Sequence, residues 1–236
     1  MNFLEAKWRN LIMANYAVDP KVLIPYLPNG LELDNFEGKF YVSLVGFMFN
    51  KTRIFKIPIP YLGSFEEINL RFYVKRKHEG KIKRGVVFIN ETVPYAPVAW
   101  MANYLYKEHY TAVKTKHHWE FTDLLKTIDY SWENNKKWNN IRVNAHTKGS
   151  EMEAGSVEAF IFEHYYGYTR VNQSKTLEYR INHPSWKINQ VIDHSIDCDF
   201  EKMYGPDFTF LNVQQPDNVI LAEGSDVSVK WKRIAI

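Results

Sequence analysis

The chain has 236 residues, 45% of them hydrophobic and 16% aromatic, so it can bury a sizeable core and is not disordered as a whole. Lys and Arg number 30 and Asp and Glu 27, a balance that argues against nucleic acid or an anionic membrane as a partner. A single cysteine, Cys198, excludes an intrachain disulfide framework.

The N-terminal segment carries charges where a signal peptide needs an unbroken apolar core. No apolar run approaches the length of a membrane span. With the lone cysteine, this predicts a soluble, cytoplasmic protein. Cys198 lies between Asp197 and Asp199, whose carboxylates disfavour a thiolate, so we do not expect it to act as a nucleophile.

Capping and turn signals organise the first part of the chain. Asp19 as N-cap and Pro20 as first helical residue predict a helix, which later prolines keep short. A hairpin is predicted next, with strands at 31–34 and 40–49 joined by a turn at Glu37-Gly38. A proline-punctuated loop at 57–63 then leads into the strand that carries Glu67.

The rest of the chain is dominated by strand patterns. The Glu67 strand pairs with residues 84–91 across the Glu79-Gly80 turn, and one clear helix then opens at Pro97 and runs to Leu105. Further strands are predicted at 110–121, 128–132, 141–146, 157–164, 176–181, 188–196 and 227–234. Many strands with one or two short helices indicate a mainly β, β-rich α+β fold, an antiparallel barrel or sandwich. No repeat or linker divides the chain, so we expect a single domain over residues 1–236.

The strand around Glu67 is the most informative segment. Glu67, Asn69 and Arg71 alternate with apolar residues and therefore converge on one face. A carboxylate, an amide and a guanidinium at this spacing can recognise a small polar ligand, and Arg71 could hold a carboxylate with two parallel hydrogen bonds. The alternative is an ordinary amphipathic strand whose polar face lies in water.

The other charged and titratable residues are expected to be solvated or structural, and not part of a site. The basic run 75–84 coincides with a hairpin tip and is expected to be solvated, because it lacks the interleaved aromatics of a single-strand nucleic-acid site. The histidines lack metal-ligand spacing; His117 and His118 diverge on a strand. The adjacent Lys136-Lys137 pair lies in an asparagine-rich turn and is expected to be exposed. We expect no metal and no cofactor.

A set of ordered segments carries a family resemblance. These are Trp8, Val18-Asp19-Pro20, LPNGLELD at 27–34, YVSLVGF at 41–47, FEEINLRFYV at 65–74, GVVF at 85–88, Glu163-His164-Tyr165 and His183-Pro184-Ser185-Trp186. Together they resemble a bacterial family of unknown function in the acetoacetate decarboxylase-like superfamily. The resemblance implies a single domain built around a curved, cone-like antiparallel β-barrel with an internal pocket.

The decarboxylase pattern carries over only in part. There a strand glutamate lines the pocket, and Glu67 is the natural match, with Glu66 the other choice. There, too, adjacent lysines follow the pocket helix and the first forms a Schiff base, whereas Tyr110-Thr111 stands at that place here. Lys107 and Lys114 flank the place without occupying it. We therefore expect no Schiff-base decarboxylation.

These observations lead to a specific hypothesis for the pocket. Arg71 anchors a ligand carboxylate or another oxyanion, while Glu67 and Asn69 orient Arg71 or bond the ligand. The remaining predicted wall residues are Tyr73, Tyr104 and Tyr110.

Two functions remain open. One is binding of a small organic acid or keto acid without turnover. The other is a lyase- or isomerase-type enzyme on a small keto acid, with Glu67 as acid and base. An interaction module that uses the basic hairpin is a third, less favoured interpretation. The oligomeric state, including a homo-oligomer, is left open.

Overall fold

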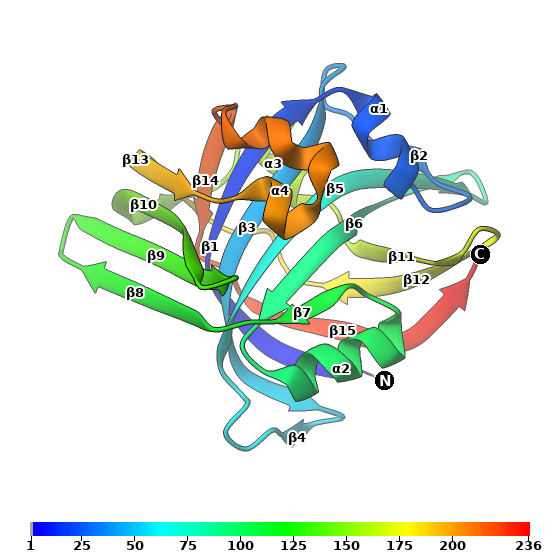
Figure 1. Ribbon diagram of the computed structural model, residues 1–236, viewed down its shortest axis with the longest axis horizontal. Coiled ribbons are helices and arrows are strands. Elements are labelled where there is room, and N and C mark those ends of the chain that lie inside the picture. The colour runs from blue at the N-terminus through cyan, green and yellow to red at the C-terminus, as the bar shows by residue number, and fades with distance from the viewer. Residues whose placement is uncertain (1) are drawn as a thin grey trace.

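The computed structural model describes residues 2–236, without the side chains of residues 232–234; Met1 of the predicted domain lies outside the described residues. Within this range, fifteen strands form one strongly curved sheet, and an additional pairing of β1 with β3 closes part of it into a ring. The ring strands are β1 (Asn2–Val18), β3 (Phe40–Ile54), β5 (Phe65–His78), β6 (Lys81–Val93), β11 (Tyr166–Asn172), β12 (Lys175–Asn182) and β15 (Asp226–Ala235). Their pairings are antiparallel except β6 with β11. The predicted mainly β barrel is thus confirmed (Figure 1).

A second part of the sheet continues from β1 and extends away from the ring (Figure 1). We call it the wing; it comprises β14 (Asn218–Ala222), β13 (Ile188–Asp197), β10 (Lys137–Ser150), β9 (Leu125–Asn134) and β8 (Thr115–Phe121). Its apolar residues, such as Trp132 and Ile141, share one core cluster with Ile68 and Leu70 on the outer face of β5. The outer face of the ring is therefore buried where the wing covers it.

Short strands and helices complete the described residues. The strands are β2 (Glu32–Leu33), β4 (Ile57–Pro58) and β7 (Tyr110–Ala112); the helices are α1 (Pro20–Leu23), α2 (Ala96–Tyr106), α3 (Val157–Phe162) and α4 (Phe200–Tyr204), with 3₁₀ turns η1 (Ile24–Tyr26) and η2 (Pro206–Asn212). The predicted start of α1 is confirmed, because the Asp19 side chain accepts a hydrogen bond from the Lys21 backbone N–H at 2.9 Å. Of the helices in residues 2–236, none has the length and apolar character needed to cross a membrane.

Three predicted elements are corrected. Within the predicted strand 157–164, residues 157–162 form a helix, α3, because the Ser156 side chain caps its N-terminus. The apolar run that follows is buried on all sides, a pattern that buried strands and buried helices share. Strand β2 pairs with β5 and not with β3, since Asp34 is drawn to Lys75 and Arg84 across that edge. The predicted strand 110–121 is two strands, β7 beside β6 and β8 beside β9.

The strands β1, β11 and β14 had not been predicted, and β4 lies in the segment predicted as a loop at 57–63. In β1 the cause is visible: its pairing register shifts near Asn2 and between Glu5 and Lys7, and Asn10 has a φ of 51°. Such irregularities disrupt the simple alternation of polar and apolar residues by which a strand is recognised.

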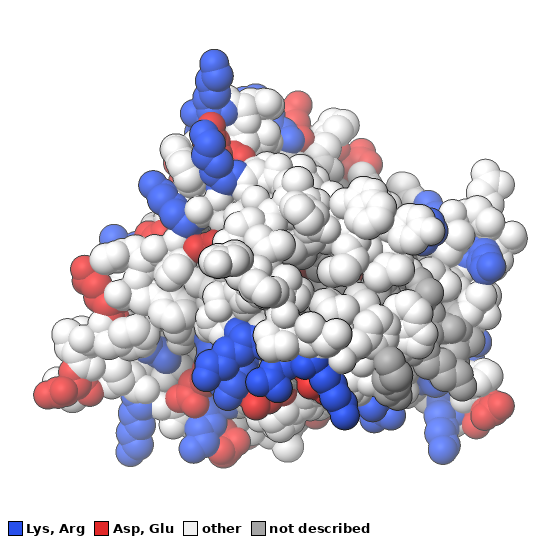
Figure 2. All heavy atoms as spheres, turned by 90° about the horizontal axis from the view of Figure 1, so that it is seen from below, with Lys and Arg blue, Asp and Glu red and all other residues white. Residues whose placement is uncertain are grey.

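The basic hairpin is only partly solvated, which corrects the prediction for residues 75–84. Arg76 and Lys83 form ion pairs with buried Glu178 at 2.9 and 2.6 Å, and the exposed part is limited to the tip at 77–82. On the face seen in Figure 2, basic and acidic side chains surround a broad uncharged centre. These charges show no single-sign field on that face.

Candidate functional site

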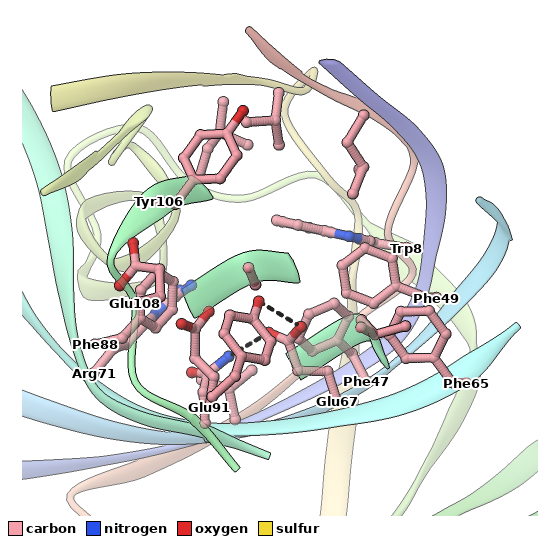
Figure 3. A pocket seen from close by; sticks show the side chains of 18 of the residues that line it. Trp8, Phe47, Phe49, Phe65, Glu67, Arg71, Phe88, Glu91, Tyr106 and Glu108 are labelled. Carbon is pink, nitrogen blue, oxygen red and sulfur yellow. Dashed lines mark hydrogen bonds between the residues drawn. The ribbon is translucent and has the colours of Figure 1, made fainter. Parts of the chain in front are cut away.

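A pocket with a volume of about 110 Å³ lies inside the ring, between β5 and β6 on one side and helix α2 on another (Figure 3). Its size suits several water molecules or a ligand of a few non-hydrogen atoms. Apolar side chains make up most of its wall: Phe3, Leu4, Trp8, Leu11, Val45, Phe47, Phe49, Phe65, Phe88, Val98, Met101, Ala102, Ile181 and Val229. The pocket therefore offers an apolar surface with a limited set of polar groups.

Strand β5 supplies three of these polar groups. Glu67, Asn69 and Arg71 all line the pocket, because alternate residues of a strand share a face and the opposite face is packed under the wing. Glu67 is 3% exposed and Asn69 1%. The structure thus brings the three predicted residues together, and the interpretation of a polar face in water is wrong.

Glu67 is held by two donors. The Asn69 side chain donates to Oε1 at 3.2 Å and the Tyr110 hydroxyl to Oε2 at 3.1 Å. Burial, followed in the same direction by the charge of Glu108, outweighs these bonds and raises the pKa of Glu67 to about 7. Glu67 can therefore gain or lose a proton near neutral pH.

Tyr110 reaches the pocket because of a local hydrogen-bond pair. The Asn103 side chain on α2 donates to the Tyr110 carbonyl at 2.9 Å and accepts from its N–H at 2.7 Å. Strand β7 then runs parallel to β6, with Tyr110 opposite Glu91. This places a phenol at the position where the resemblance puts a lysine, and no lysine is among the described residues that line the pocket.

Two further carboxyl groups, which the sequence had not singled out, face the same pocket. Glu108 accepts hydrogen bonds from Thr169 Oγ1 at 2.6 Å and from the Tyr179 hydroxyl at 2.7 Å, and burial raises its pKa to about 7. Glu91 lies on β6 opposite Asn69, and burial, then the charges of Glu108 and Glu67, raises its pKa well above the ordinary value. The register of β5 with β6 could have identified Glu91, but Glu108 lies in a loop that gives no such signal.

Arg71 is the cation of this group. Its Nε has no hydrogen-bond partner among the described residues, Nη2 lies 3.9 Å from the sulfur of Met13, and Cζ lies 5.7 Å from the ring centre of Tyr73. The expected contact with Glu67 is not a salt bridge, since the described residues hold no Arg71–carboxylate pair within 4.0 Å. The guanidinium therefore keeps hydrogen-bonding capacity for another group.

The other two predicted tyrosines lie outside the pocket wall. The Tyr73 hydroxyl lies 2.6 Å from Ser43 Oγ, and its ring packs against Phe160 and His164. Tyr104 is 63% exposed and stacks on Trp100, with ring centres 5.4 Å apart. On helix α2 the inward positions are those of Val98, Met101 and Ala102, so Tyr104 faces away from the pocket.

Other predicted features can be placed as well. Within the described residues, His, Cys, Asp and Glu form no group of three or more that could hold a metal. Burial, followed by the charges of Asp199 and Asp197, raises the pKa of the Cys198 thiol well above its usual range, in the predicted direction. Lys136 and Lys137 are exposed, as expected for a turn.

The fold and site place the chain in a known structural class. It is similar to acetoacetate decarboxylase from Legionella pneumophila, with a TM-score of 0.68 and 11% identity over 100% of this chain and 90% of that one. An acetoacetate decarboxylase-like enzyme from Sphingomonas wittichii RW1 gives a TM-score of 0.65 and 9% identity, over 100% of this chain and 94% of that one. The enduracididine biosynthesis enzyme MppR, complexed with pyruvate, gives a TM-score of 0.66 and 11% identity, over 100% of this chain and 91% of that one. At these identities the likeness establishes the fold alone.

The family is also established. Residues 5–226 match the DUF2071 family, described as an uncharacterized conserved protein, and the chain belongs to it. It is 34% identical over 84 residues to the uncharacterized protein YqjF of Bacillus subtilis (strain 168), a match that covers 35% of this chain. The aligned part spans 33% of the length of that relative. The resemblance inferred from the sequence segments is thereby confirmed.

Proposed function

We propose that the protein binds a small organic acid or keto acid in the pocket, with the ligand carboxylate on Arg71. The observation that carries this proposal is the Arg71 guanidinium, whose Nε has no partner among the described residues although it faces a largely apolar pocket. A guanidinium in such surroundings matches a carboxylate through two parallel hydrogen bonds. The pyruvate complex of MppR, a structure of the same fold, supports a keto acid as the ligand class.

The three carboxyl groups are compatible with an anionic ligand. Burial raises the pKa values of Glu67 and Glu108 to about 7 and that of Glu91 well above its ordinary value, so the three groups are only partly ionised near neutral pH. They therefore cancel the positive charge of Arg71 only in part, and a carboxyl group that is neutral can donate to a ligand oxygen. The aromatic side chains on the opposite side from Arg71, such as Trp8 and Phe49, would contact the apolar part of the ligand (Figure 3).

A second candidate is an enzyme that uses Glu67 for proton transfer on such a keto acid. The position of Glu67 favours it: a buried carboxyl group, fixed by Asn69 and Tyr110, with a pKa of about 7. A general acid or base is most effective when its pKa lies near the working pH. By contrast, the interaction module loses support, since charges of the basic hairpin are paired with Asp34 and Glu178 of the same chain.

The binding proposal is tested by thermal unfolding of the wild type, Arg71→Gln and Arg142→Gln at pH 6. Arg142 is exposed on β10 and serves as the matched control. The added compounds are pyruvate and acetoacetate, with acetone as a neutral comparison. At a hundred times its dissociation constant, a ligand stabilises the folded state by about 2.7 kcal/mol.

We expect both acids, and not acetone, to raise the melting temperature of the wild type and of Arg142→Gln. Folded Arg71→Gln should show no such shift. If the melting temperature of Arg71→Gln rises by the same amount as that of the wild type, Arg71 does not hold the ligand carboxylate. A wild type that responds to neither acid would contradict the proposed ligand class.

A further inference from the structure

We propose that the pocket catalyses enolisation of a small keto acid, in which Glu67 removes a proton from the carbon next to the carbonyl group and Glu91 donates a proton to the carbonyl oxygen. This inference rests on the proposed function, since the keto acid must first be held through Arg71. It assigns a catalytic role to Glu91, which the sequence did not single out.

The sheet register places the two carboxyl groups side by side on the pocket face. Asn69 on β5 pairs directly with Glu91 on β6, and Glu67 lies two residues before Asn69 on the same face. Glu67 and Glu91 are therefore diagonal neighbours, with a separation of about 7–8 Å between Cα atoms. Both line the pocket, so a carbon atom and the adjacent carbonyl oxygen of one ligand can each face one of them.

The hydrogen bonds divide the two roles. Both oxygens of Glu67 accept a bond, from Asn69 and from Tyr110, which favours the ionised form because hydrogen bonds donated to a carboxylate stabilise its charge. Glu91 is 2% exposed; it shares the Tyr110 hydroxyl with Glu67, and its Oε2 has no donor among the described residues. This favours a neutral carboxyl group that retains a proton for a ligand oxygen.

A second observation points to a ligand. The side-chain oxygen of Asn69, which is 1% exposed, also lacks a donor among the described residues. Buried polar atoms are normally hydrogen-bonded. Unpartnered atoms of Asn69, Arg71, Glu91 and Glu108 all belong to residues that line this pocket, so the pocket concentrates hydrogen-bonding groups that the described residues leave unsatisfied.

The proposed step balances without a co-reactant. The C–H bond breaks and its proton goes to the Glu67 carboxylate, while its electron pair forms the carbon–carbon double bond. The carbonyl π electrons move to oxygen, which takes the proton of Glu91. The reverse step returns the ketone, and a proton exchanged with solvent on Glu67 is then incorporated at carbon.

Charged and titratable groups around Glu91 define the electrostatics of the step. They are Glu67 and Arg71 on β5, Glu108 after α2, Tyr110 on β7 and Tyr179 on β12. Glu108 does not need to touch the ligand, because its two hydroxyl donors fix it in the wall. In its ionised form, Glu108 favours protonation of Glu91, which makes Glu108 a positioning residue.

The test is deuterium incorporation into the methyl group of pyruvate in D₂O, followed by proton NMR at neutral pD. The proteins are the wild type, Glu67→Gln, Glu91→Gln and Glu91→Asp, with Glu153→Gln as control. Glu153 is an exposed glutamate outside the pocket. Pyruvate binding to each protein is measured in parallel by thermal shift.

We expect the wild type and Glu153→Gln to accelerate the exchange. Glu67→Gln and Glu91→Gln should each lose at least about 100-fold of that rate while still binding pyruvate, which is the usual contribution of a general acid or base. Glu91→Asp keeps a carboxyl group and should retain part of the exchange rate. This variant therefore still tests the role of Glu91 if Glu91→Gln does not fold.

Two results would overturn the inference and leave binding intact: a wild type that binds pyruvate without accelerating exchange, or Glu91→Gln that exchanges at the wild-type rate. A wild type that does not bind pyruvate would instead overturn the proposed function. The two failures are thus distinguished by the thermal-shift measurement.

Discussion

Glu108→Gln tests how strongly the pocket carboxyl groups affect folding. The substitution keeps an oxygen that can accept from Thr169 and Tyr179 and removes the titrating proton. In the folded protein the pKa of Glu108 is raised from 4.5 to about 7, mainly by burial. The folded state therefore binds this proton more tightly than the unfolded state does.

The sign and size of the effect follow from this difference. The stabilisation from the proton is fully present below pH 4.5 and is lost as pH rises towards 7, because the unfolded chain ionises first. One pKa unit corresponds to about 1.4 kcal/mol, so the wild type loses about 2 to 3 kcal/mol through Glu108 between pH 5 and pH 8. Glu108→Gln has no such loss. Its free energy of unfolding, relative to wild type, should rise by that amount over the same interval.

The measurement is urea unfolding of both proteins at pH 5, 6, 7 and 8. The amide also introduces a buried N–H group, whose cost does not depend on pH, so the change between pH values is compared and not the absolute difference. Glu178→Gln is the control. Glu178 is also buried, but bonds from Lys83 and Arg76 overcome the effect of burial and lower its pKa. The free energy of unfolding of Glu178→Gln relative to wild type should therefore stay constant from pH 5 to pH 8. A constant difference for Glu108→Gln as well would refute the reasoning.

Two further predictions concern packing and the lone thiol. In Gly167→Ala the new methyl group would overlap the Tyr179 ring, so urea unfolding should show a loss of about 1–3 kcal/mol from overpacking, and the shift with pyruvate should weaken because Tyr179 holds Glu108. Cys198, which is 9% exposed and has a raised pKa because of burial, should react with Ellman's reagent only after denaturation.

The sequence predicts the parts of this fold that rest on local signals. The β5–β6 hairpin follows from its alternation and the Glu79-Gly80 turn, and α1 follows from Asp19 and the prolines. It does not predict β1, because bulges disturb its pattern. Nor does it separate helix α3 from a strand, since a short apolar run that is buried on every side has no periodicity.

The same division applies to the site. Glu67, Asn69 and Arg71 could be grouped because they alternate within one strand. Which face points inward, however, depends on the wing, and the wing is formed by strands far along the chain. Glu108 joins the pocket through Thr169 and Tyr179, about 60 and 70 residues later. Tertiary contacts of this kind leave no trace in local spacing.

Glu108 and Glu178 are two buried glutamates with different partners. Both are glutamates of similar burial, at 6% and 2% exposed. Glu178 has two cations, Arg76 and Lys83, as a stable buried carboxylate requires. Glu108 has two hydroxyl donors and, among the described residues, no cation within salt-bridge distance, and it lies with two further carboxyl groups beside a single arginine. At Glu178, two cations thus stabilise a buried carboxylate in its ionised form. In the pocket, burial instead raises the pKa values of Glu67 and Glu108 to about 7, at a cost in folding free energy. This contrast supports the proposed role of the pocket in proton transfer.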